Sequence, residues 1–384
     1  MTKSEQERMN GKKKINNYYD YSLLFLTIFL SCFGMVMIYS TSSYTAQVKF
    51  SDPTYFLKKQ LVSVILGVIA MLAVSKIDYR ILMKKAGRIP FNLVTLAYLM
   101  AIILQTYVLF FGKEFNGAKR WISLGPFGTF QPSEFTKVVA IIFVSYIVNK
   151  LPRSLNRVSG FIRVMILASP LIFLIVIENL STALVVSAIV VGICFVASRK
   201  KWYYFFFGFL FVGMVVAYIF LGDEFRSVRI DVWRNVETHP LGFQILQGLY
   251  AIASGGVFGT GLGESMQKLG FIPESHNDMI FSIICEELGL FGAIAVVLLF
   301  VLLIWRLFII SINAPDLFGG LICSGVLIHI AVQVIINVAV VTNSIPSTGI
   351  PLPFISYGGT SVAILLAEMG LALSVSNQIR SERI

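Results

Sequence analysis

The sequence predicts an all-α polytopic membrane protein with ten transmembrane helices, both termini in the cytoplasm, and a large extracytoplasmic loop between helices 7 and 8. Hydrophobic residues make up 57% of the 384 residues and charged residues only 13%, and the mean hydropathy is +0.81. Soluble domains contain fewer apolar and about twice as many charged residues. The apolar residues recur in runs of about 20, long enough to cross a hydrocarbon core of about 30 Å.

The charge distribution indicates a membrane topology rather than a nucleic-acid partner. The net charge is +11, but Lys and Arg cluster in short segments between the apolar runs. The segments assigned to the cytoplasm carry twice as many of these residues as the segments assigned outside, as the positive-inside rule requires. We therefore expect a basic cytoplasmic tail at 1–20, a membrane domain at 21–377 and a cytoplasmic C-terminal tail at 378–384.

The expected spans are long apolar runs with polar ends. They cover residues 21–41, 59–75, 89–112, 134–149, 161–177, 182–198, 203–221, 279–307, 316–341 and 358–377. The first run is too long and too far from the N-terminus for a signal peptide, so we expect a retained anchor. The polar residues at 178–181 interrupt a long apolar stretch, either as a break in one helix or as a tight extracytoplasmic turn between two. The alternation of charge favours the turn.

The loop at 222–278 is the longest segment outside the predicted membrane spans. Its stretch 243–253 is amphipathic and suits the interface plane. The following glycine-rich run, SGGVFGTGLGE at 254–264, lacks the Lys-Ser of a nucleotide-binding loop and faces away from cytoplasmic ATP. We expect its glycines to permit tight turns and close approach of the backbone to lipid or substrate.

A thiolate or histidine metal site is not expected. The four cysteines all fall inside apolar runs, so they indicate neither a disulfide framework nor a cysteine metal site. The three histidines are too scattered for a His cluster, and His329, in an apolar helix, is expected to be packed and hydrogen-bonded.

An acidic, hydrogen-bonding stretch, PESHNDMIF at 273–281, stands directly before a long apolar run. Asn277 or Asp278 could cap the helix that starts near Met279, and Asp278 would suit the positive end of its dipole. A cap explains one polar residue and not the whole run. The functional alternative is that Asp278 is a general base at the membrane surface, where a partly dry site raises its basicity.

Charged residues inside predicted spans need a partner or a function, because each costs about 2.5–3.5 kcal/mol at the centre of a span. Glu134 and Lys137 lie one turn apart after Pro132, which suits a first helical turn. They could form a local ion pair, or Lys137 could bind a diphosphate together with Arg120. Glu286, Glu287 and Glu368 are expected to be mainly structural partners of cations or hydrogen-bond donors.

The segment NSIPSTGIPLPFISYGG at 343–359 cannot be a regular helix, because it contains three prolines and three glycines. Irregular backbone at membrane depth must be buried in protein or line a wet cavity. We expect either an extracytoplasmic or re-entrant wall of the site, or a rigid loop between two spans.

Three sequence blocks carry a family resemblance. They are NGAKRWISLGPFGTFQPSEFTK at 116–137, PESHNDMIF with the following EELG at 286–289, and STGIPLPFISYGGTS at 347–361. In this order they resemble the SEDS family of shape, elongation, division and sporulation proteins, which FtsW and RodA typify. The resemblance covers nearly the whole chain.

The resemblance implies a peptidoglycan glycosyltransferase that polymerises lipid II on the outer face of the bacterial plasma membrane. The reaction inverts the anomeric carbon and releases undecaprenyl diphosphate. Asp278 matches the family's essential aspartate and would deprotonate the acceptor hydroxyl, directly or through a divalent cation such as Mg²⁺ or Mn²⁺. The family's basic and acidic positions match Arg120, Glu134 and Lys137, and Arg226 and His276 are further candidates for substrate contact.

The glycine-rich block resembles the FtsW and SpoVE branch more than RodA, which implies a role in cell division at the septum. ENLSTA at 178–183 and Asn277 depart from the common family pattern, so elongation and sporulation stay open. The expected partners are a class B penicillin-binding protein transpeptidase and other divisome membrane proteins. A lipid II flippase and a scaffold that recruits division proteins are the alternatives, and the gathering of polar residues with Asp278 on one face favours the enzyme.

Overall fold

The computed structural model describes residues 17–85, 91–115, 118–123, 125, 129–206, 208 and 224–380. The helices are α2 (Tyr21–Phe50), α3 (Tyr55–Lys76), α4 (Leu93–Phe111), α5 (Pro132–Lys150), α6 (Val158–Glu178), α7 (Leu180–Ala197), α9 (Glu224–Arg234), α10 (Phe243–Ser254), α11 (Ile280–Asn313), α12 (Leu317–Val341) and α13 (Thr360–Ser376). Short 3₁₀ helices lie at η1 (Tyr79–Met83), η3 (Ser154–Asn156) and η4 (Pro240–Gly242).

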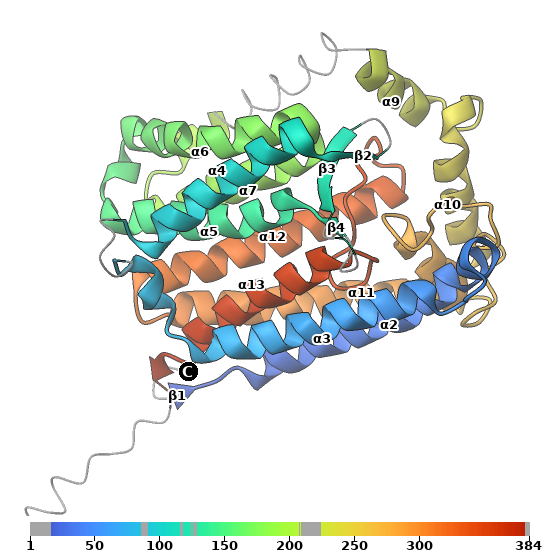
Figure 1. Cartoon of the computed structure of the whole chain (residues 1–384), viewed down its shortest axis with the longest axis horizontal. Coiled ribbons are helices and arrows are strands. Elements are labelled where there is room, and N and C mark those ends of the chain that lie inside the picture. The colour runs from blue at the N-terminus through green and yellow to red at the C-terminus, as the bar shows by residue number, and fades with distance from the viewer. Residues whose placement is uncertain are drawn as a thin grey trace, which may run out of the picture.

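Two small antiparallel sheets close the ends of the helical bundle. At one end, β1 (Asn17–Tyr18) pairs with β5 (Ile379–Arg380), so the first and last described segments lie together (Figure 1). Near the other end, β2 (Lys113–Phe115), β3 (Ala118–Ser123) and β4 (Thr129–Phe130) form a sheet in the order β2-β3-β4. Helices α9 and α10 lie at this second end, across the ends of the long helices.

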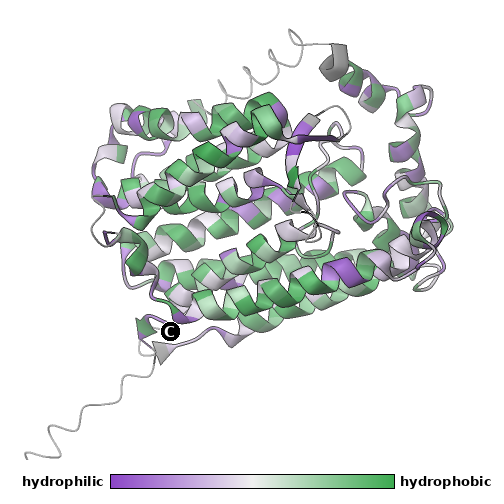
Figure 2. Ribbon diagram, viewed as in Figure 1, coloured by the Kyte–Doolittle hydropathy of each residue, from purple (hydrophilic) through white to green (hydrophobic). Residues whose placement is uncertain are grey.

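The long helices confirm a multi-pass membrane protein. Eight of the described helices are long and apolar enough to span a membrane, and α13 is a shorter apolar helix. Together they correspond to nine of the ten predicted spans, and most of the predicted span at 203–221 lies outside the described residues. Hydrophobic residues cover the length of the bundle, and hydrophilic residues gather at its two ends (Figure 2).

The helix ends differ from the predicted span ends, because a helix can continue past the apolar run that crosses the membrane. Helix α2 runs to Phe50, well beyond the predicted end at 41, and carries Lys49 in its last turn. Helix α11 likewise runs to Asn313 rather than to 307.

Small residues allow α3 and α13 to pack closely against each other. A Cβ on Gly67 would lie 2.6 Å from Leu366 Cδ1, and a Cβ on Gly370 would lie 2.7 Å from the Met71 carbonyl oxygen. Close approach through glycine is a common way to pack helices in a membrane, where dispersion contacts replace the hydrophobic effect. Helices α5 and α12 are the most enclosed spans.

The predicted tight turn between two spans is confirmed at Asn179. This residue is extended, with φ −152°, and separates α6 from α7. Its Oδ1 accepts a hydrogen bond from the Thr182 backbone N–H at 3.2 Å, which caps α7. The two helices pack against each other, so the segment is a helical hairpin and not one broken helix.

The span predicted at 279–307 corresponds to α11, but Gly289 interrupts the helix with φ 66° and ψ −168°. The glycine-rich loop enters this break. Backbone N–H groups of Thr260 and Gly261 donate to the carbonyls of Glu286 and Glu287 at 2.9 and 3.0 Å. In return, the N–H groups that follow the break, at positions 290 and 291, donate to loop carbonyls at 256 and 257. The loop backbone therefore satisfies the hydrogen bonds that the helix loses.

Candidate active site

Asp278 stands at the end of the 224–278 segment, immediately before Met279, the N-cap residue of α11. The side chain of Met279 makes no capping hydrogen bond. The amide of Asn277 instead donates to Glu274 Oε2 at 2.8 Å. Capping therefore does not account for the acidic run.

Asn337 of α12 fixes the backbone at Asp278. Its Nδ2 donates to the Asp278 carbonyl at 2.8 Å and to the Ile350 carbonyl at 2.9 Å. A Cβ on Gly349 would lie 3.9 Å from Asp278 Oδ2, so the carboxylate faces the irregular 343–359 segment. This segment thus forms a wall beside Asp278.

The surroundings of Asp278 favour its neutral form. Burial raises the pKa of the Asp278 carboxyl, and the negative charge of Glu274 raises it further. Backbone N–H groups of Asp278 and Met279 and the positive charge of Arg229 act in the opposite direction. The pKa remains above the ordinary aspartate value, which makes the carboxylate a better proton acceptor than a solvated one.

Two arginines are linked electrostatically to Asp278, Arg229 directly and Arg120 through Arg229. Arg120 of β3 donates from Nε to the Glu178 carbonyl at 2.9 Å, at the C-terminal end of α6. Burial lowers the pKa of Arg120, and the nearby positive charge of Arg229 lowers it further. Arg229 also acts on the Asp278 carboxylate, so Arg229 connects the two predicted site residues electrostatically. Its Nη1 donates to the Ser347 carbonyl at 3.4 Å.

The sequence reasoning selected Arg226 and missed Arg229. Both residues belong to α9, one helical turn apart, and the side chain of Arg226 lies outside the described residues. The available signal was this spacing, since residues three apart share a helix face. It could have indicated a pair of arginines rather than one.

Lys137 and Glu134 form the local ion pair that was one of the two alternatives. Lys137 Nζ lies 2.9 Å from Glu134 Oε2, and the Lys137 side chain is almost completely buried. Pro132 occupies the first turn of α5, as predicted. The pairing neutralises a charge inside a span, and binding of a diphosphate by Lys137 stays a prediction.

His276 packs among aromatic rings. Its ring centroid lies 4.3 Å from that of Phe56 and 5.5 Å from that of Tyr357, and its carbonyl accepts from the Tyr357 N–H at 2.9 Å. Burial lowers the pKa of His276 to about 4, so the ring is neutral at physiological pH. Its position is that of a packed residue beside Asp278, and its contact with substrate stays a prediction.

Comparisons with a family profile, with individual relatives and with solved structures all point to the same protein family. A family profile described as "Cell cycle protein", which covers FtsW, RodA and SpoVE, matches residues 21–381. The chain belongs to the FtsW/RodA/SpoVE family.

Individual relatives cover nearly all of this family member. It is 36% identical over 362 residues to a probable peptidoglycan glycosyltransferase FtsW of Trichlorobacter lovleyi, covering 93% of each chain. It is 37% identical over 372 residues to the stage V sporulation protein E of Bacillus subtilis, covering 94% of this chain and 98% of the relative.

Two solved structures share the fold. One comes from a structure described as "Structural coordination of polymerization and crosslinking by a peptidoglycan synthase complex". It matches with a TM-score of 0.76 and 27% identity, and the match covers 93% of this chain and 97% of the matched chain. The Thermus thermophilus rod shape determining protein RodA has a TM-score of 0.67 and 27% identity and covers 94% of this chain and 98% of its own.

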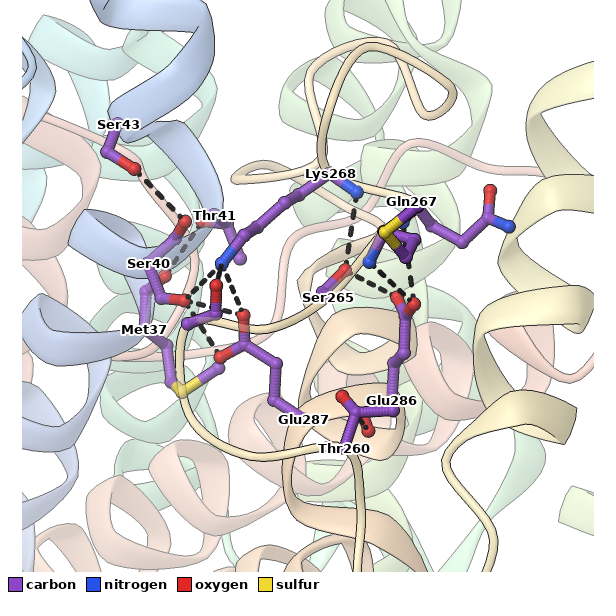
Figure 3. Close-up of polar contacts among 12 residues, drawn as sticks. Met37, Ser40, Thr41, Ser43, Thr260, Ser265, Gln267, Lys268, Glu286 and Glu287 are labelled. Atoms are coloured by element: carbon purple, nitrogen blue, oxygen red, sulfur yellow. Dashed lines mark hydrogen bonds and ion pairs between the residues drawn. The ribbon is translucent and has the colours of Figure 1, made fainter.

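In this FtsW/RodA/SpoVE family member, Glu286, Glu287 and Glu368 have structural partners, as expected. Glu286 accepts from the Met266 N–H at 2.9 Å, and Glu287 pairs with Lys268 at 2.8 Å (Figure 3). Glu368 pairs with His329 at 2.9 Å between α13 and α12.

A divalent cation would find few protein ligands at Asp278. Among the residues that the structure describes, no three His, Cys, Asp or Glu side chains gather as a metal site. Mg²⁺ commonly uses one or two carboxylates and takes its other ligands from water and substrate phosphates. Asp278, with Glu274 close enough to raise its pKa, fits that limited role.

Proposed function

We propose that this family member is a peptidoglycan glycosyltransferase that polymerises lipid II on the extracytoplasmic face of the plasma membrane and releases undecaprenyl diphosphate. The observation that carries the proposal is the partly buried carboxylate of Asp278, which has a raised pKa and interacts with Arg229, while Arg229 in turn acts on Arg120. A base and a set of fixed cations are the two features that this transfer needs. The relative named a probable peptidoglycan glycosyltransferase FtsW supports the same reaction class.

In the proposed step, Asp278 accepts the proton of the acceptor sugar hydroxyl. The resulting oxygen nucleophile attacks the anomeric carbon of the donor from the face opposite the diphosphate, and the bond from that carbon to the diphosphate oxygen breaks. Attack from the opposite face inverts the anomeric carbon. Arg120 and Arg229 stabilise the negative charge that develops on the leaving diphosphate, and Lys137 is a further candidate for this role. Asp278 would help to hold a divalent cation, which would supply additional positive charge to the leaving group.

The proposed topology places both termini in the cytoplasm and the 222–278 loop outside the cell. Two observations support it. The segments β1 and β5 pair at one end of the bundle, and α9 and α10 lie at the other end. Asp278 directly precedes α11, which packs against α10. The membrane domain then occupies 21–377, between a basic tail at 1–20 and a short tail at 378–384.

We further propose a role in cell division at the septum, with a class B penicillin-binding protein and other divisome membrane proteins as partners. The solved synthase complex that couples polymerization to crosslinking supports a transpeptidase partner. The similar identities to an FtsW and to a sporulation protein keep elongation and sporulation as alternative roles.

The test compares bond formation with transport. Purified protein, with its cognate penicillin-binding protein, is incubated with lipid II, and glycan strands are separated by length. In parallel, protein-containing vesicles are assayed for movement of a fluorescent lipid II between leaflets. Glycan polymer without accelerated movement is the expected result. Accelerated movement without polymer would instead identify a flippase.

A further inference from the structure

The segment that follows the glycine-rich loop is joined to α11 by a buried ion pair. Lys268 of this segment and Glu287 of α11 approach to 2.8 Å, and both side chains are buried. All three protons of the Lys268 ammonium have acceptors, namely Glu287 Oε1, Ser40 Oγ at 3.2 Å and the Gly263 carbonyl at 2.6 Å. The lysine therefore has one well-defined orientation (Figure 3).

The neighbouring residue Glu286 accepts hydrogen bonds from residues 265–267 of the same segment. Its carboxylate accepts from Ser265 Oγ and from the backbone N–H groups of Met266 and Gln267 at 2.9 and 3.4 Å. Consecutive helical residues point about 100° apart. The two glutamates thus hold the 265–268 segment from two sides of α11.

Helix α2 anchors the loop on both sides of Asp278. Ser40 donates to both carboxylate oxygens of Glu287 at 2.6 and 2.8 Å. The next residue, Thr41, accepts from Ser275 Oγ at 3.0 Å through its carbonyl. Asp278 lies in the sequence between Ser275 and the first turns of α11, so these contacts tie the chain to α2 on both sides of Asp278.

The buried ion pair between Lys268 and Glu287 is better explained as a device that fixes the position of the loop than as a source of stability. Desolvation of two buried charges offsets most of their attraction, and apolar residues of similar volume are often equally stabilising. A charged pair with several directional hydrogen bonds fixes relative position more narrowly than apolar contacts do.

We propose that Ser40, Lys268 and Glu287 are positioning residues that hold Asp278 in the orientation needed to deprotonate the acceptor. This inference rests on the proposed glycosyltransferase function. None of the three touches the reacting atoms. They act on Asp278 through the 268–278 segment on one side and through the first turns of α11 on the other.

The test separates positioning from folding with three variants. Lys268→Met leaves Glu287 as an unpaired buried charge and is expected to lower both the melting temperature and kcat. Lys268→Met combined with Glu287→Met removes both charges and should recover the melting temperature. If the pair positions Asp278, kcat of this double variant stays about 10- to 100-fold below the wild-type value, with the KM for lipid II within about twofold, because a small misplacement of a catalytic group has this effect. Recovery of kcat together with the melting temperature would show that the pair is only structural.

The matched control is the exposed ion pair between Lys58 and Asp52, which join at 2.9 Å on the same side of the bundle. Lys58→Met combined with Asp52→Asn should leave kcat unchanged. Hydrogen exchange gives a readout that needs no activity. Backbone amides at 271–279 should exchange faster in the Lys268/Glu287 double variant than in the wild type and the control. Unchanged exchange would overturn the proposal even if the wild type did not polymerise lipid II, whereas an inactive wild type would count against the proposed function alone.

Discussion

At the residue scale, the neighbours of Asp278 shift its pKa in opposite directions. Glu274 raises its pKa, whereas Arg229 lowers it, and burial is the largest cause of the net rise. A general base works only when deprotonated. The acid limb of the kcat/KM profile, which reports the free enzyme, should therefore lie above the ordinary range of an aspartate.

Glu274 and Arg229 allow a test of whether Asp278 is the general base, because removing each of them should shift the acid limb of the pH profile in a different direction. Glu274→Gln removes a negative charge, lowers the pKa of Asp278, and should move the acid limb of kcat/KM to lower pH. Arg229→Ala removes a positive charge and should move the limb to higher pH. The profiles are measured as initial rates of lipid II polymerisation between pH 4 and 8. Shifts of the same sign in both variants would assign the limb to a group other than Asp278.

Arg229 also has a predicted role in leaving-group stabilisation. Arg229→Ala should lower kcat by about 100-fold at a pH where Asp278 is deprotonated, because a fixed charge aimed at a developing negative charge contributes about this much. Arg234→Ala, on the same helix, is the matched control and should keep the wild-type rate. Equal rates in the two variants would place Arg229 outside the diphosphate site.

At the element scale, the break in α11 depends on two glycines that meet backbone to backbone. A Cβ on Gly259 would lie 2.2 Å from the Glu287 carbonyl oxygen, and a Cβ on Gly289 would lie 2.3 Å from the Gly259 nitrogen. Both residues have positive φ, 82° and 66°. This crossing is what allows the loop to reach the glutamates of α11.

Alanine at Gly259 should therefore destabilise the protein more than alanine at the nearby Gly263. Gly263 has φ 89° but no atom within 4 Å of a Cβ, so Gly263→Ala adds only backbone strain, about 1–2 kcal/mol. Gly259→Ala adds the same strain and an overlap with α11, and should lower the melting temperature in detergent more. An equal fall in melting temperature in the two variants would show that the overlap with α11 costs no stability beyond the backbone strain.

The same elements show what the sequence could and could not predict. The apolar runs predicted nine described helices, because a span must bury its backbone polar groups whatever its neighbours are. The break at Gly289 was not predictable, since an isolated glycine in an apolar run carries no signal for a contact with residues at 256–261. Asp278 could be selected from its local sequence, whereas Arg229 acts there only because α9 folds back over the 343–359 segment.

At the scale of the whole molecule, polar networks lie at both ends of the apolar bundle. Asp20, at the start of α2, pairs with Arg306 of α11 at 2.7 Å. Ser40, farther along α2, binds Glu287 of the same partner helix. Helices α2 and α11 are thus joined at one end near the chain termini and at the other near Asp278.

The proposed topology predicts opposite accessibility for these two ends. Lys58→Cys should react with a membrane-impermeant maleimide in intact cells, and Arg153→Cys should react only after permeabilisation. Both side chains are exposed, and the four native cysteines lie within helices, so the native protein gives the background. Labelling of Arg153→Cys in intact cells would reverse the orientation and place Asp278 in the cytoplasm.

The most direct measurement is lipid II polymerisation by the wild type, Asp278→Asn and Asp278→Ala, each purified with the cognate penicillin-binding protein and matched for folding. Both variants should bind lipid II with wild-type affinity and form no glycan strands, because neither side chain can accept the acceptor's proton. Polymer formed at the wild-type rate by either variant would contradict the assignment of Asp278 as the general base.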